Sequence, residues 1–240
     1  MRIITAQEIE EVMNFRDLLE TLRRAFRVGA VAPSPLTQRI ARPTGLDDGS
    51  LTISSAWHDF AAQDTIERGF IGTRIESSLP GSQEHQSPSV AGVYLLQSGK
   101  TGTPLALLDG KALVNWRTAA TSALASSYLS REDSSRLLMV GAGSLAPYLI
   151  EAHASVRPIK EVLVWNRSLP GLSSWWRPCR ARPLRFRPQR IWAGLFVGRI
   201  SFAAPRVRIG RSSKANGFRK ARIWIWWARP MRINVSAIMR

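Results

Sequence analysis

Acidic residues are missing from the last third of this 240-residue chain. All seventeen Asp and Glu residues lie at or before Glu161, and residues 1–168 balance them with 17 of the 34 Lys and Arg residues. The formal charge of +17 therefore belongs entirely to residues 169–240. That segment also lacks Thr, Tyr and His, and it holds 15 Arg and six of the nine Trp. We infer that two kinds of polypeptide meet near Ser168.

Cysteine and long apolar runs are also scarce. Cys179 is the only cysteine, which excludes a disulfide framework within one chain. No apolar stretch approaches the roughly 20 residues that span a bilayer, and the start, Met1–Thr5, lacks the apolar region of a signal peptide. The three histidines are scattered without the spacing of metal ligands. We therefore expect a cytoplasmic protein with no membrane partner and no metal.

The first half of the chain predicts an α+β domain. Thr5 followed by Glu8 is a capping-box signature for a helix start. Apolar residues then recur at helical spacing, which predicts one helix or two in succession over residues 6–28, ended by Pro33 and Pro35. Beyond them we expect a strand-rich segment, a β-hairpin and a helix of small residues, at residues 36–75, 90–96 with 104–108, and 112–129.

A second pattern begins at Arg136. An apolar run of strand length, residues 136–140, precedes a glycine-containing turn and a helix that reaches about Val156. Residues 161–165 then predict a second strand. A strand, a glycine turn, a helix and a strand within about 30 residues form one βαβ unit, which opens a Rossmann-type domain.

The turn of this unit carries the pattern of a dinucleotide site. Gly141, Gly143 and Ala146 form G-x-G-x-x-A between a strand and a helix, which is the context that this pattern requires. The first glycine permits the tight turn, the second admits the pyrophosphate, and the small third residue lets helix and strand pack closely. Ser144 and Leu145 complete the helix N-terminus, where an anion is favoured. The alternative is a purely structural glycine turn.

The end of the second strand favours NADP over NAD. A NAD site usually places Asp or Glu there, bonded to the ribose hydroxyls. This chain has Asn166 and Arg167 instead, and an arginine at this point can pair with a 2′-phosphate. The alternative for Arg167 is a solvated loop arginine.

Arg117 begins the small-residue helix and is a candidate anion ligand. Its planar guanidinium can bind a carboxylate through two parallel hydrogen bonds. By composition alone, a surface ion pair is an equal alternative.

Several of these segments together resemble one known family. They are similar to the ornithine cyclodeaminase/mu-crystallin family. The segments concerned are residues 93–98 and 101–110, the run Arg117-Thr118-Ala119-Ala120, the turn Val140–Gly143 and the strand end at 164–167. The resemblance is specific over residues 90–168, looser before them, and covers about the first 168 residues.

The resemblance implies a homodimer-forming substrate domain, a Rossmann domain for NAD(P), and chemistry at the Cα–N bond of a small amino or imino acid. Ornithine cyclodeaminase itself converts ornithine to proline and releases ammonia, and relatives reduce cyclic imines or act as alanine dehydrogenases. Arg117 would hold the substrate carboxylate with Arg39 as a partner, and the adjacent Thr118 would lie at the cofactor. Where the family commonly has Gly-x-Lys, this chain has Gly72-Thr73-Arg74. A guanidinium keeps the charge of a lysine but does not readily exchange a proton.

The basic tail has two interpretations. Codons can be chosen for two of its segments so that translation from the third base gives sequences like strands of the family. Residues 221–228 then read Thr-His-Leu-Asp-Leu-Val-Gly, and residues 198–205 read Ala-Asp-Ile-Val-Cys-Gly-Thr. We therefore expect an out-of-frame end, either frameshifted or pseudogene-like in an impaired enzyme, or the result of a sequencing error in an active reductase. The alternative is a nucleic-acid-binding tail that acts through phosphate contacts and Trp stacking. The apolar clump of Trp224, Trp226 and Trp227 argues against a solvated binding arm.

The sequence thus predicts an α/β chain in three parts. An N-terminal α+β substrate and dimerisation domain covers residues 1–130. The start of a Rossmann-type NAD(P)-binding domain follows at residues 131–168, and an irregular basic tail occupies residues 169–240.

Overall fold

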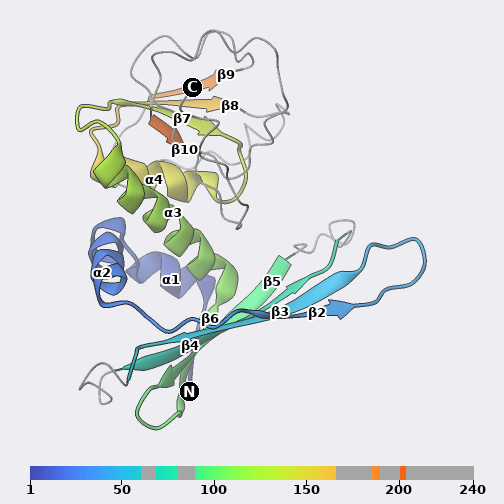
Figure 1. Cartoon of the computed structure of the whole chain (residues 1–240). Coiled ribbons are helices and arrows are strands. Elements are labelled where there is room, and N and C mark those ends of the chain that lie inside the picture. Colours follow the sequence, from blue (N-terminus) through green and yellow to red (C-terminus); the bar gives the residue numbers. More distant parts are fainter. Residues whose placement is uncertain (61–68, 81–89, 166–184, 190–200, 204–240) are drawn as a thin grey trace, which may run out of the picture. The chain divides into compact units, whose positions relative to one another are not determined.

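The computed structural model describes residues 1–60, 69–80, 90–165, 185–189 and 201–203. These fall into two compact units, which divide after Arg117 (Figure 1). This division lies within one long helix, and the domain limit at residue 130 stays a prediction.

The first unit is built on a six-stranded sheet of order β1-β6-β5-β4-β3-β2. Strand β1 pairs with β6 in parallel, and the other neighbours are antiparallel. The elements are β1 (Arg2–Ile4), α1 (Ala6–Val12), α2 (Phe15–Val28), β2 (Leu36–Ile40), β3 (Gly49–Trp57), β4 (Phe70–Ser78), β5 (Val90–Ser98) and β6 (Pro104–Asp109). The strand-rich segment and the predicted hairpin are therefore confirmed.

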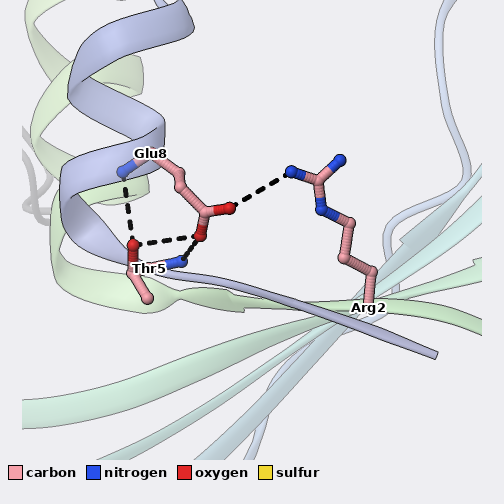
Figure 2. Close-up of polar contacts among 3 residues, drawn as sticks. All are labelled: Arg2, Thr5 and Glu8. Carbon is pink, nitrogen blue, oxygen red and sulfur yellow. Dashed lines mark hydrogen bonds and ion pairs between the residues drawn. The ribbon is translucent and has the colours of Figure 1, made fainter.

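Both signals of the predicted capping box are satisfied at the start of α1 (Figure 2). The backbone N–H of Glu8 donates to the Thr5 hydroxyl at 3.3 Å, and the backbone N–H of Thr5 donates to the Glu8 carboxylate at 2.8 Å. Arg2 also donates to this carboxylate at 3.1 Å. The Thr5 backbone bond is the largest cause of a lowered Glu8 pKa, because each of these bonds favours the charged carboxylate.

The predicted helical segment is two helices, and the prolines do not end the second one. Asn14 separates them, since its side chain caps α2 by accepting from the Asp17 N–H at 2.9 Å. Helix α2 ends at Gly29, whose φ of 85° is a conformation that favours glycine. Pro33 lies beyond that end, so a glycine C-cap, which the sequence analysis overlooked, stops the helix.

Aromatic packing joins the helices of this unit. The rings of Phe15 (α2) and Trp116 lie 4.3 Å apart, and both side chains are buried. The indole N–H of Trp116 donates to Glu10 on α1 at 3.3 Å. Trp116 belongs to α3 (Gly110–Leu129), whose first turn is capped by Asp109 through a 2.7 Å bond from the Ala112 N–H. The cap thus places the start of α3, and with it Arg117, directly after β6.

The second unit contains a parallel sheet of order β10-β7-β8-β9. Its elements after α3 are β7 (Arg136–Val140), α4 (Ala146–Val156), β8 (Glu161–Trp165), β9 (Arg185–Gln189) and β10 (Ser201–Ala203). Consecutive residues of β7 and β8 are buried, as in a parallel sheet that is covered on both faces. The βαβ unit is confirmed.

The expectation of an irregular tail is wrong for eight of its residues. Strand β9 pairs with β8, and β10 pairs with β7, both in parallel. The rest of residues 169–240 lies outside the described residues.

Candidate functional site

The first unit carries a polar cluster on one face of its sheet. Arg74 on β4 lies directly opposite Tyr94 on β5, and such partners project to the same face. Gly72 and Glu76 share this face because side chains alternate along a strand. Ser54 on β3 continues the row, since it pairs with Arg74.

Gly72 makes room for the phenol of Tyr94. A Cβ atom on Gly72 would lie 1.7 Å from the Tyr94 hydroxyl oxygen and 2.6 Å from Cζ, distances that no real contact allows. The Tyr94 side chain therefore leans across Gly72, which places its hydroxyl group beside the backbone of β4. Any larger residue at position 72 would displace the phenol.

Two cations and one acid surround this phenol. Arg74 forms an ion pair with Glu76 at 3.0 Å, and each side chain keeps 28% of its surface exposed. Arg117 on α3 belongs to the same cluster. Its charge lowers the pKa of Tyr94, and the charge of Arg74 lowers the pKa of Arg117. The cluster can therefore hold an anion such as a carboxylate.

The pKa values of the cluster follow from burial and charge. Arg117 is exposed as a whole residue, but protein atoms crowd its guanidinium, and this desolvation lowers its pKa, with a further lowering by Arg74. Burial is also the largest influence on Tyr94 and raises its pKa, although the charge of Arg117 acts in the opposite direction. Tyr94 is thus held in its neutral form, as a hydrogen-bond donor.

Arg39 does not join this cluster. It lies on the same face, but it pairs with Ser50, whereas Arg74 pairs with Ser54 four residues along β3. Its guanidinium forms an ion pair with Asp48, and its side chain is 76% exposed. The structure therefore brings together Arg74 and Arg117 of the three predicted arginines.

The sequence analysis overlooked Tyr94. The available signal was Gly72 itself, because a glycine inside a strand often marks the close approach of another group. The alternation of side chains through residues 90–98 also places Tyr94 on one face of a hairpin strand. Neither signal identifies the partner without the register between β4 and β5.

The glycine turn of the second unit leaves open space at its second glycine. Gly141 has a φ of 105°, which favours glycine, and Ala146 is fully buried where α4 meets β7. Gly143 is exposed, and a Cβ atom added to it would meet nothing within 4 Å. The protein's own packing therefore does not require glycine at position 143, and the open space suits the close approach of a phosphate group.

The N-terminus of α4 is only partly suited to an anion. The Leu145 side chain has no oxygen atom and does not cap the N-terminus of α4. The Ala146 N–H donates to Gly143 at 2.9 Å, and Pro147 has no N–H to offer. The exposed Ser144 belongs to the same turn, and Thr118 lies half-buried on α3. Asn166 and Arg167 lie outside the described residues.

The described residues offer no metal site and no membrane-spanning helix. No group of three or more His, Cys, Asp or Glu side chains could hold a metal ion in that part of the chain. None of its helices is both long and apolar enough to cross a membrane.

Several curated relatives match about 70% of the chain. An uncharacterized protein of Schizosaccharomyces pombe is 37% identical over 175 residues, which cover 72% of this chain and 51% of the relative. The Delta(1)-pyrroline-2-carboxylate reductase of Colwellia psychrerythraea is 33% identical over 174 residues, which cover 72% of this chain and 52% of the relative. The chain thus spans about half the length of the curated relatives it matches.

Solved structures share the fold. The Thermococcus litoralis Delta(1)-pyrroline-2-carboxylate reductase, in complex with NADH and L-proline, matches with a TM-score of 0.68 at 22% identity, over 85% of this chain and 62% of that one. An archaeal alanine dehydrogenase dimer with bound NAD matches with a TM-score of 0.65 at 25% identity, over 79% and 56%.

The family model for ornithine cyclodeaminase/mu-crystallin proteins matches residues 2–181, three quarters of the chain. The match extends 13 residues past the expected limit at Ser168 (181 − 168). This chain belongs to the ornithine cyclodeaminase/mu-crystallin family.

Proposed function

We propose that this protein is a nicotinamide-dependent enzyme that acts at the Cα–N bond of a small amino or imino acid. The reaction is the reduction of a cyclic imino acid, or the conversion of ornithine to proline with release of ammonia. The observation that carries the proposal is the cluster of Arg74, Tyr94 and Arg117, which suits a small carboxylate. Relatives named as pyrroline-2-carboxylate reductases support this substrate class.

Arg117 is the residue that we assign to the substrate carboxylate. Its guanidinium is partly desolvated, which strengthens an ion pair with an incoming anion. Arg74 adds positive potential, but it is paired with Glu76 and does not readily transfer a proton. Arg39 would have to leave Asp48 to take part, so we assign it a secondary role in substrate binding.

We propose NADP in preference to NAD as the cofactor, because Arg167 stands where a NAD site usually has an acid. The open face of Gly143 fits a pyrophosphate, and Gly141, Ser144, Leu145 and Ala146 shape the turn around it. Thr118 and Asn166 are further proposed contacts. When bound, the nicotinamide supplies or accepts the hydride.

We further propose that the segment after Ser168 is translated out of frame and that the chain is an impaired enzyme. The charge asymmetry supports this proposal, since the segment holds all of the net charge and no acidic residue. Sequencing the gene around codons 168–175 tests it. A missing or extra base should be found there, and correcting it should restore the family's reading frame. Tight, steeply salt-dependent DNA binding would instead favour the nucleic-acid function of the tail.

A homodimer is proposed through the opposite face of the six-stranded sheet. Leu36, Ile53, Ile75 and Val93 form a row across β2, β3, β4 and β5 on that face. Leu36 is 56% exposed and Ile75 37% within one chain, and such an apolar row favours burial against a second copy. Sedimentation of the wild-type chain and of an Ile75→Lys variant tests this, with a shift to monomer expected for the variant.

Product analysis distinguishes the two reactions. The full chain is incubated with pyrroline-2-carboxylate and a reduced nicotinamide, or with ornithine and an oxidised one, and proline is measured by mass spectrometry. Proline from the first mixture alone supports a reductase, and proline from the second supports a cyclodeaminase. No proline from either mixture at high enzyme concentration would contradict the proposed function of this chain.

A further inference from the structure

We propose that Tyr94 is a substrate-binding residue, the neutral hydrogen-bond donor that completes the carboxylate subsite beside Arg117. This inference rests on the proposed function and gives a specific role to one member of the cluster that supports it. It follows from how the phenol is positioned, from its protonation state and from the charges around it.

The position of the phenol is fixed by two strands. Tyr94 lies opposite Arg74 on β5, and its hydroxyl oxygen occupies the space where a Cβ atom of Gly72 would be. A large side chain that crosses a neighbouring strand over a glycine has few other rotamers available. The hydroxyl group is therefore held near the backbone of β4 before any ligand arrives, which lowers the entropy cost of binding.

The hydroxyl group keeps its proton at neutral pH. Burial raises the pKa of Tyr94 above its ordinary value of 10.0, and the charge of Arg117 offsets part of this rise. The charged groups that share the cluster are Arg74 and Glu76 of β4 and Arg117 of α3. The residues directly opposite Arg74 and Tyr94 on β3 and β6 are Ser54 and Leu108, which do not titrate.

A neutral donor suits the charge balance of this cluster. Arg74 already lowers the pKa of Arg117, so the two cations repel each other, and a third cation would increase that cost. A carboxylate has about four acceptor positions, of which a bidentate guanidinium uses two. The phenol O–H supplies a further donor without adding charge.

Ligand binding by the full chain tests the proposal without requiring turnover. The probe is pyrrole-2-carboxylate, a planar carboxylate that cannot be reduced like an imine. Tyrosine labelled with 13C at Cζ gives signals from Tyr94, Tyr128 and Tyr148, and the Tyr94→Phe variant assigns the first. We expect the Tyr94 signal to shift on binding and its pKa to rise further, because a bound anion disfavours the phenolate.

The expected loss of affinity in Tyr94→Phe is about tenfold, the size of one hydrogen bond to a charged group. Gly72→Ala keeps the hydroxyl group of Tyr94 but displaces it, so this variant should weaken binding to a similar extent. Tyr128→Phe is the matched control, since Tyr128 is 64% exposed on α3, and it should bind as the wild type does. Wild-type affinity should also fall as the pH rises through the Tyr94 pKa, and Tyr94→Phe should lack this fall.

Three outcomes would contradict the role of Tyr94 or the carboxylate site to which it belongs. If Arg117→Met loses binding but Tyr94→Phe binds as tightly as wild type, then Tyr94 has no role and the proposed function stands. If the Tyr94 signal and its pKa do not respond to saturating pyrrole-2-carboxylate, the phenol does not contact the carboxylate. If the wild-type chain does not bind the probe at all, both the inference and the proposed carboxylate site are wrong.

Discussion

Ser122 on α3 and His153 on α4 share a hydrogen bond of 3.1 Å inside the second unit. Both side chains are buried, and the other ring nitrogen of His153, Nδ1, has no hydrogen-bond partner among the described residues. Burial, and secondly the charge of Arg157, lower the pKa of this histidine from 6.5 to about 4. His153 is therefore neutral at pH 7, and its buried position has a cost that depends on pH.

This histidine makes the chain less stable in mild acid. Its folded pKa lies below its unfolded pKa, so the unfolded state binds the extra proton between pH 6.5 and about 4. The free energy of unfolding falls as the pH is lowered through that window, by a total of about 3 kcal/mol from this one group. Urea unfolding at several pH values measures the slope. His153→Gln should remove this contribution and Ser122→Ala should retain it; an unchanged slope in His153→Gln would assign the acid sensitivity to other groups.

Arg157 holds the C-terminal end of α3 through its fork of donors. Its Nη2 donates to the carbonyl oxygens of Ser126, Ser127 and Ser130 at 3.2, 2.8 and 2.9 Å. Arg157→Met should lower the free energy of unfolding by about 2 kcal/mol, because part-buried carbonyl groups lose charged donors. Arg157→Lys should recover only part of this, since a lysine has no counterpart of the Nε that donates to the Ser130 hydroxyl at 2.9 Å or of the Nη1 that donates to the Val156 carbonyl at 2.8 Å. Full recovery in the lysine variant would mean that charge alone matters.

The capping box predicts a smaller effect at α1. Thr5→Ala removes the acceptor for the Glu8 N–H and should lower stability by about 1 kcal/mol, whereas Thr5→Ser should retain it. Because the pKa of Glu8 is lowered, its contribution is present above the ordinary value of 4.5 and is lost as the pH falls through the folded pKa. Thermal melts at neutral and acidic pH check both statements. Equal melts of Thr5→Ala and Thr5→Ser would contradict the cap.

The two turn glycines should respond differently to alanine. Gly141→Ala forces a side chain into a φ of 105° and should destabilise the fold by about 1–3 kcal/mol. Gly143→Ala fills open space, so it should melt like the wild type but lose signal in saturation-transfer NMR with NADPH. Reduced stability with unchanged NADPH signal in Gly143→Ala would place the nucleotide elsewhere.

Local signals in the sequence predicted most of the elements. The capping box at Thr5, the hairpin of β5 and β6, and the βαβ unit around Gly141 all depend on residues that are close in the chain, and the structure confirms them. The end of α2 at Val28 agrees with the prediction, but its cause was not predicted, because Gly29 acts through a positive φ and the prolines further along gave a more obvious signal.

The candidate site was harder to predict because it depends on strand register. Arg74 and Arg117 were found from a family resemblance, but Tyr94 meets Gly72 only through the pairing of β4 with β5. The ion pair of Arg39 with Asp48 is equally invisible without the conformation of the β2–β3 connection. A shift of one residue in either pairing would move these side chains to the other face.

The most direct test of the account is whether the chain consumes a reduced nicotinamide in a way that depends on Arg117. The full chain and its Arg117→Met variant are compared with pyrroline-2-carboxylate and NADPH, by following the nicotinamide absorbance at high enzyme concentration. We expect a slow rate in the wild type and a loss of about a hundredfold in the variant, since about 3 kcal/mol of carboxylate binding is removed. Equal rates in the two proteins, or no consumption above the enzyme-free reaction, would contradict the account.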